Sequence, residues 1–273
     1  MKATDFTYAG ERLSDYGMMV AGFDSSNSVE SINTDSQRTF GTVSMFYGKY
    51  QPFVYTLYEN RLVIEFSIIK KMDCSNTSEE EYDPILSQTE IRSIKRWLNR
   101  PTPHKLSFDD EEYEDYYWEG SFNIAEQYFG GVPCGLSLTF ESNRPFAIMD
   151  EVVFEGELEA DGTFTINDTS DEEGWIYPSL SVTCLSAGDL QLENNMEEGR
   201  LTIVKNCEEN ETIMFAPNLQ IRSSLGTHEL GDDFNYKFLR IYNTYDQREN
   251  VITANLPISY TLKYNPIAKV VIA

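Results

Sequence analysis

The sequence predicts a mainly β protein that folds as two domains. Its 273 residues exceed the about 100 to 200 residues of one ordinary domain. Aromatic residues make up 13% of the chain, against only 16 glycines and 10 prolines, and flat aromatic side chains cover pleated sheet surfaces well. In the second half, turn residues recur about every eight to twelve positions, which is typical of a β-sandwich or jelly roll. We place the boundary near residue 149, which gives domains 1–149 and 150–273.

The first domain contains strands in which apolar residues alternate with polar ones. A period of two places one face of each strand in a hydrophobic core. The clearest runs are Leu62, Ile64, Phe66 and Ile68, and later Leu136, Leu138 and Phe140.

One helix is predicted between these runs, over residues 88–99. It begins with a capping box, in which Ser87 caps a free amide and Glu90 reaches back to the start of the helix. The apolar residues that follow have helical spacing, so we expect Trp97 to pack in the core, and two prolines prevent continuation. The residues that define the apolar face and the end are Ile91, Ile94, Trp97 and Leu98, followed by Pro101 and Pro103.

The second domain is predicted to be a succession of short strands separated by turns. No internal repeat of about 20 to 50 residues is visible, so a solenoid or a propeller is not indicated. The predicted strands are 151–159, 163–167, 179–185, 189–193, 200–205, 211–215, 218–222, 236–242, 250–254 and 257–264.

The charge of the chain argues against ordinary binding of DNA or RNA. Its 45 acidic and 21 basic residues give a formal net charge of −24, whereas neutralising phosphates requires clustered Lys and Arg. A high net charge supports solubility. It also has the sign expected of a protein that lets DNA slide past without sticking, and both interpretations stay open.

The cysteines and the apolar stretches indicate neither a metal site nor a membrane span. Cys74, Cys134, Cys184 and Cys207 are widely spaced and form no CxxC pair, so we expect reduced, buried thiols and no metal or other cofactor. No stretch approaches the about 18 apolar residues that would span a bilayer. The start of the chain lacks the pattern of a leader peptide, and we expect the protein to fold in the cytoplasm.

No constellation of residues predicts catalysis. Neither His104 nor His228 lies near a serine or cysteine in a recognisable nucleophile motif, and we expect both histidines in turns or at the surface. The acidic runs 79–83 and 109–115 lack the spaced ligands and turn glycine of a calcium-binding loop, so we expect solvated loops there. Paired glycosidase carboxylates cannot be recognised in a sequence. We therefore predict no catalytic residues and no enzymatic activity.

Aromatic residues of the second domain raise the possibility of a face that stacks on carbohydrate. Trp175, in a turn between Gly174 and Pro178, is the candidate for exposure, and with Tyr177 it forms the possible sugar contact. Tyr260 and Tyr264 share strand parity with neighbouring apolar residues, so we expect them to lie in a buried face instead.

A series of motifs in the first half resembles the distal tail proteins of siphophages, the phages with long tails. The motifs occur in the family's order and at its spacing. They are Phe6 to Met18, Arg96-Trp97-Leu98, Pro103 to Phe108, Trp118 to Phe122, Gly135 to Phe140 and Arg144 to Ala147.

The resemblance continues through the second half, so it covers nearly the whole chain. One departure is the segment 243–250, where relatives tend to have a glycine-rich turn. The matching motifs are Gly174 to Val182, Asn218 to Ser223, Phe234 to Leu239, Asn250 to Ile252 and Ile258 to Tyr264.

This resemblance implies a structural protein of the virion, at the distal end of the tail and assembled in the host cytoplasm. Domain 1–149 would be a tail-tube-like β-barrel or sandwich with one helix, and six copies would close into a ring. Domain 150–273 would be a galectin-like or carbohydrate-module-like jelly-roll sandwich at the periphery. The implied partners are the tail tube protein, the tail-associated hub protein and the tape-measure protein, with DNA passing through the lumen without specific binding.

Two functions of other classes compete with this one. A carbohydrate-binding module that recognises cell-wall glycans of the host would rest on Trp175 and the all-β second half. A glycoside hydrolase would rest on the abundance of acidic residues alone. Shared sandwich architecture does not establish sugar binding, because a fold does not imply a function.

Overall fold

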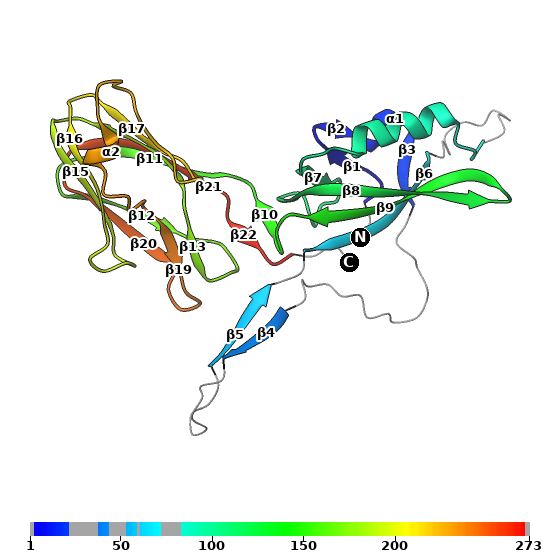
Figure 1. Cartoon of the computed structure of the whole chain (residues 1–273), viewed down its shortest axis with the longest axis horizontal. Coiled ribbons are helices and arrows are strands. Elements are labelled where there is room, and N and C mark those ends of the chain that lie inside the picture. Colours follow the sequence, from blue (N-terminus) through cyan, green and yellow to red (C-terminus); the bar gives the residue numbers. More distant parts are fainter. Residues whose placement is uncertain (1–2, 22–37, 44–52, 59–60, 72–82, 271–273) are drawn as a thin grey trace. The chain divides into compact units, whose positions relative to one another are not determined.

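The computed structural model describes residues 3–21, 38–43, 53–58, 61–71 and 83–270, in two compact units (Figure 1). The first unit comprises Met1–Ile148 and Lys269–Ala273, and the second comprises Met149–Ala268. The predicted boundary places everything after residue 149 in the second domain, whereas the chain from Lys269 onward groups with the first unit. The chain passes from one unit to the other at strands β10 (Ala147–Met149) and β22 (Ile267–Ala268).

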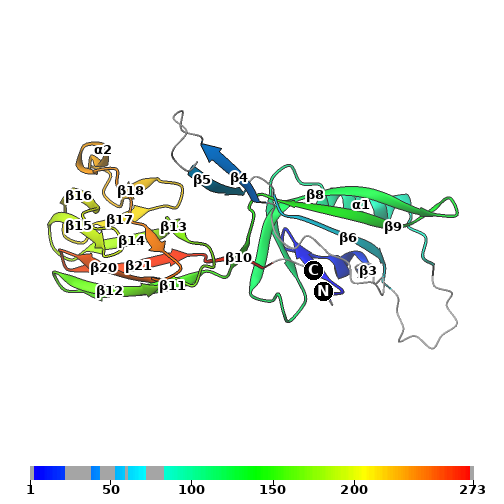
Figure 2. The ribbon, with the colours of Figure 1, turned by 90° about the horizontal axis from the view of Figure 1, so that it is seen from below.

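The first unit is built on one antiparallel sheet, with helix α1 against it (Figures 1 and 2). A separate antiparallel hairpin consists of β4 (Arg38–Val43) and β5 (Phe53–Tyr58). The main sheet has the order β2 (Glu11–Arg12), β1 (Phe6–Tyr8), β7 (His104–Phe108), β8 (Tyr116–Phe129), β9 (Val132–Ser142), β6 (Val63–Lys70) and β3 (Met18–Ala21).

Helix α1 (Gln88–Leu98) begins as predicted and ends one residue earlier. The capping box is present, because the amide of Glu90 donates to Ser87 Oγ at 3.3 Å and the amide of Ser87 donates to Glu90 Oε2 at 2.7 Å. Both bonds satisfy donors that the helix itself leaves unpaired. The buried face is the predicted one, namely Ile91, Ile94, Trp97 and Leu98.

Trp97 joins this helix to the beginning of the chain, and its predicted core position is confirmed at 2% exposure. Its ring stacks on Phe6, with centroids 5.6 Å apart, and on Tyr16 at 4.5 Å. Its Nε1 donates to the carbonyl oxygen of Tyr8 at 2.9 Å. The indole therefore buries its apolar surface without leaving its polar atom unpaired. Tyr16 belongs to the 3₁₀ helix η1 (Leu13–Tyr16).

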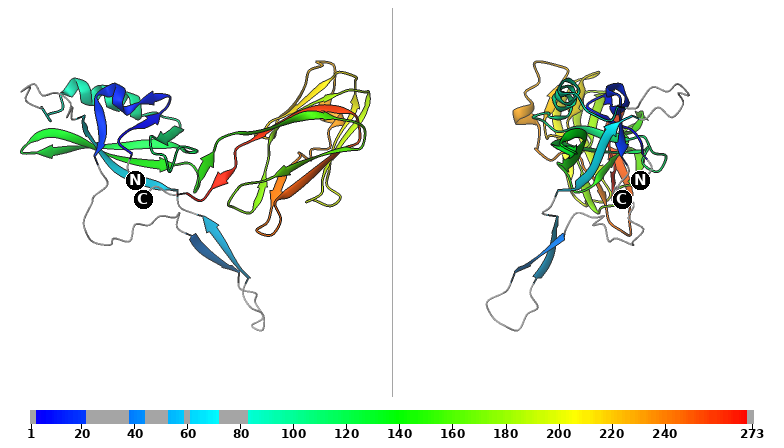
Figure 3. Two further views of the ribbon diagram at one scale, coloured as in Figure 1. Left: turned by 180° about the vertical axis from the view of Figure 1, so that it is seen from behind. Right: turned by 90° about the vertical axis from the view of Figure 1, so that its right-hand side faces the viewer.

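The second unit is a β-sandwich of two antiparallel sheets, as predicted (Figure 3). Alternate residues of each strand fill the interior, and Val182, Leu192 and Ile252 are almost completely buried. One sheet has the order β11 (Val152–Leu158), β21 (Ile258–Tyr264), β14 (Ser179–Cys184), β17 (Thr212–Phe215) and β18 (Ile221–Ser223). The other has the order β12 (Gly162–Asn167), β20 (Glu249–Ala254), β15 (Gly188–Asn194) and β16 (Leu201–Cys207).

Three predictions for this unit were wrong in detail. The turn around Trp175 is a short strand, β13 (Gly174–Ile176), paired with β19 (Ile241–Asn243). Of the predicted strand 236–242, only residues 241–242 lie in a strand, and 236–240 are irregular. A short helix, α2 (Leu230–Asp233), occupies a segment predicted to be loop.

The cysteines agree in part with the prediction. Cys184 and Cys207 are free and buried, whereas Cys134 is free but only half-buried. Cys74 lies outside the described residues.

Replacing Trp97 by alanine should lower the stability of the first unit by about 3 to 5 kcal/mol, because it leaves a cavity between helix and sheet. The matched control is Trp175→Ala, which removes a side chain that is 55% exposed and should cost no more than about 1 kcal/mol. Hydrogen exchange of the α1 amides in the full-length protein measures the first change. Equal protection of these amides in the two variants would contradict the prediction.

Candidate functional site

The described residues show neither a metal centre nor a membrane span. No group of three or more His, Cys, Asp or Glu side chains among them is arranged to hold a metal ion. No helix in the described part of the chain is long and apolar enough to cross a bilayer.

The hairpin of β8 and β9 ends in an exposed apolar tip. Strand β8 runs over 14 residues and β9 over 11, and the hairpin reaches beyond helix α1 in Figures 1 and 2. Gly130 and Gly131 form the turn with φ values of 60° and 84°, the left-handed conformation that a tight hairpin turn requires. Around the turn, Tyr128 is 59% exposed, Phe129 80% and Val132 40%.

The stem of this hairpin is tied to the rest of the first unit. Lys95 Nζ of helix α1 donates to Glu126 Oε1 at 2.5 Å. Gln127 Nε2 donates to Ser67 Oγ at 2.8 Å, and the amide of Leu86 donates to the carbonyl oxygen of Pro133 at 2.9 Å. The exposed side chains are thus presented on a fixed stem. Sequence reasoning missed them, although Tyr-Phe-Gly-Gly after a run of alternating residues is a hairpin signal.

The second candidate surface surrounds Trp175 on β13. Its predicted exposure is confirmed at 55%. Its cross-strand partner is Tyr242, and the two rings lie 6.3 Å apart at 24°. The guanidinium of Arg240 lies over the indole, 4.7 Å from the ring centroid. Tyr177, the other predicted sugar contact, is half-buried and packs edge-on against Phe238 at 6.5 Å instead.

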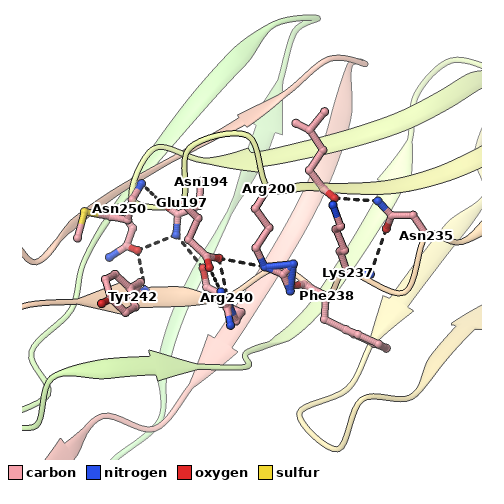
Figure 4. Close-up of polar contacts among 11 residues, drawn as sticks. Asn194, Glu197, Arg200, Asn235, Lys237, Phe238, Arg240, Tyr242 and Asn250 are labelled. Atoms are coloured by element: carbon pink, nitrogen blue, oxygen red, sulfur yellow. Dashed lines mark hydrogen bonds and ion pairs between the residues drawn. The ribbon is translucent and has the colours of Figure 1, made fainter. Parts of the chain in front are cut away.

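Arg240 is held in place by a polar network (Figure 4). Its guanidinium pairs with the carboxylate of Glu197, which also lies 3.5 Å from Arg200 Nε. The backbone carbonyl oxygen of Arg240 accepts from Asn194 Nδ2 at 2.7 Å. The same Nδ2 also donates to Asn250 Oδ1 at 2.7 Å. A sugar ring that stacked on the covered face of Trp175 would have to displace Arg240 from this network.

The tyrosines predicted to be buried are indeed buried, Tyr260 at 9% and Tyr264 at 5% exposure. The acidic run 109–115 is a loop with mostly exposed acids, as predicted, although Tyr113 within it is buried beside Trp118. Of the run 79–83, residues 79–82 lie outside the described residues.

His228 lies in a loop, as predicted, but its imidazole is buried and not at the surface. The side chain is 5% exposed, with Nδ1 2.5 Å from Glu211 Oε1 and Nε2 3.4 Å from Asp233 Oδ2. The Glu211 carboxylate is itself fully buried and accepts from Ser223 Oγ and from the amide of Glu208. A buried carboxylate needs such partners, and these two acids explain why the loop turns its histidine inward. His104 is half-buried on strand β7, edge-on to Tyr8 at 5.9 Å, and not in a turn.

Comparison with known proteins identifies the family. A model of the phage tail protein N-terminal domain matches residues 1–144, and a model of the phage tail C-terminal domain matches residues 146–264. The chain belongs to the phage tail proteins. No sequence among curated proteins matches it.

A solved structure shares the fold of this tail protein. It is the crystal structure of the SPP1 Dit (gp 19.1) protein, a paradigm of the hub adsorption apparatus in phages that infect Gram-positive bacteria. The superposition covers 96% of this chain and 98% of that chain, with a TM-score of 0.65 and 14% sequence identity. At this identity the likeness shows the fold. The family models confirm the prediction of a phage tail protein, and the fold agrees with the predicted resemblance to distal tail proteins.

The cluster that His228 forms with Glu211 and Asp233 makes the stability of the tail protein depend on pH. Burial, the largest single effect, lowers the pKa of His228, but Glu211, Cys207 and Asp233 together raise it above its ordinary value of 6.5. Burial likewise raises the pKa of Glu211, but Ser223, Glu208 and His228 together bring it below its ordinary value of 4.5. The histidine stabilises the fold at pH values below 6.5 and loses this effect as pH rises through its folded pKa. The carboxylate stabilises above pH 4.5 and loses this effect as pH falls.

The cluster should therefore stabilise the second unit most between about pH 4.5 and 6.5. His228→Gln removes the titrating group and keeps a hydrogen-bond donor. The Tm of the wild-type protein should exceed that of the variant most in this window, and the difference should shrink as pH rises toward 9. Thermal unfolding followed by circular dichroism measures both profiles. A difference in Tm that stays constant from pH 5 to 9 would show that His228 does not titrate as described.

Proposed function

We propose that six copies of this chain form a ring at the distal end of the phage tail. The ring joins the tail tube protein to the tail-associated hub protein, and the tape-measure protein and then DNA occupy its lumen without specific binding. The observation that supports this role most is the match of both halves to phage tail domains, together with a fold shared with SPP1 Dit along 96% of the chain. Assembly takes place in the host cytoplasm.

The two units divide the work in this proposal. Residues 1–149 form the ring, and residues 150–273 form a peripheral sandwich. Two compact units, each with its own buried core and its own family match, support such a division. Separate cores allow one unit to assemble while the other meets different partners.

The charge of the chain constrains both the lumen and the assembly. Each copy has a formal net charge of −24, and duplex DNA carries one negative charge per about 1.7 Å. A neutral or acidic lumen keeps the DNA from adhering during ejection. The same charge makes the copies repel one another, and salt screens that repulsion over about 8 Å at physiological strength.

The purified protein should therefore form rings whose association strengthens with salt. Negative-stain microscopy shows the rings, and sedimentation velocity at ionic strengths from low to physiological measures the association. Weaker association as salt rises would contradict the charge argument. A protein that is monomeric at every concentration and absent from virions would contradict the ring itself.

A second candidate function is recognition of host cell-wall glycans, favoured by the exposed Trp175 beside Tyr242. Exposed aromatic rings are suited to stacking on sugars, although Arg240 lies over this one. Binding to a glycan array that disappears in Trp175→Ala, and persists in Tyr245→Ala at another exposed aromatic, would support it. Absence of binding by the wild-type protein would exclude it for the glycans on the array.

A further inference from the structure

The tip of the β8–β9 hairpin concentrates apolar surface at one place. Phe129, at 80% exposure, is the most exposed large hydrophobic side chain whose burial the structure describes, and Tyr128 and Val132 lie beside the same turn. Solvated apolar side chains that cluster on a fixed stem indicate an interaction surface, whereas single exposed ones need no explanation.

The part of the hairpin nearest the tip also has no charged residue. Residues 127–140 include no Asp, Glu, Lys, Arg or His, in a chain whose formal net charge is −24. The acid nearest the tip along β8, Glu126, is neutralised by Lys95. Glu90, which caps helix α1, is paired with Lys70 at 3.1 Å. Like-charged proteins repel across most of their surfaces, so an uncharged apolar projection is where two copies approach at the least electrostatic cost.

We infer that the β8–β9 tip, residues 128–132, packs against a second copy of this chain. The inference deepens the proposed ring and rests on it. In a ring of six copies the tip meets a different surface on its neighbour, because head-to-tail contacts are the ones that close into such rings. The tip alone is smaller than a stable interface of about 1,000 Å². Each tip contact is therefore one part of a larger interface between neighbouring copies.

Phe129→Asp in the full-length protein tests the contact by sedimentation velocity at physiological salt. The residue is exposed and precedes a Gly-Gly turn, so the change leaves the fold intact, which circular dichroism verifies. Leu219→Asp is the matched control, because it adds the same charge to an exposed turn of the second unit at a φ of 62°, which aspartate tolerates. Phe129→Ala separates loss of apolar contact from added charge.

The wild-type protein and Leu219→Asp should assemble alike, whereas Phe129→Asp should sediment as a monomer at the same concentrations. Phe129→Ala should weaken association about tenfold, the effect of losing one well-buried phenylalanine contact. Normal assembly of Phe129→Asp would overturn the tip contact and leave the ring proposal standing. A wild-type protein that never assembles would overturn both.

Photo-crosslinking identifies what the tip touches. A benzoylphenylalanine in place of Phe129, in tails assembled with the partner proteins present, should yield covalent dimers of this chain. Crosslinks only to another tail protein, or no crosslinks at all, would contradict the proposal that the tip packs against a second copy of this chain.

Discussion

Trp97 lies where the parts of the first unit meet. Its ring is stacked between Phe6 and Tyr16, which belong to the first 16 residues, while its own backbone belongs to helix α1. The hydrogen bond from Nε1 to the Tyr8 carbonyl fixes strand β1 against the helix. Because β1 also pairs with β7 in the main sheet, one side chain sets the position of helix and sheet together. Lys95, two residues earlier on the same helix, then secures the hairpin stem through Glu126.

In the second unit, side chains hold one irregular segment that no neighbouring strand pairs with. Between Asn235 and Arg240 the backbone leaves the regular sheet, and remote side chains satisfy its polar groups. Arg200 Nη2 donates to the carbonyl oxygen of Phe238 at 3.0 Å, and Asn194 Nδ2 donates to that of Arg240 at 2.7 Å. Buried backbone groups must find partners somewhere, and this network both satisfies them and fixes Arg240 beside Trp175.

Local signals in the sequence predicted local structure well. The capping box at Ser87, the helical spacing up to Leu98 and the alternation within the strands each depend on neighbours a few residues away. The irregular segment 236–240 was predicted as strand because its partner Arg200 lies 38 residues from Phe238. The burial of His228 was missed for the same reason, since the carboxylate that draws it inward lies 17 residues back. The tip of the hairpin was missed because an apolar residue looks the same in a sequence whether a core covers it or solvent does.

The proposed function rests on family and fold, and the uncharged hairpin tip is the proposed means of assembly. A strongly acidic chain suits a conduit for DNA, and uncharged contacts and screening by salt lower the electrostatic cost of its association with itself. Cryo-electron microscopy of intact tails tests this most directly. Density for six copies of this chain around the axis, at the end of the tail that meets the host, is the expected result. Density for it along the shaft, or at the end that meets the capsid, would contradict the role proposed for it.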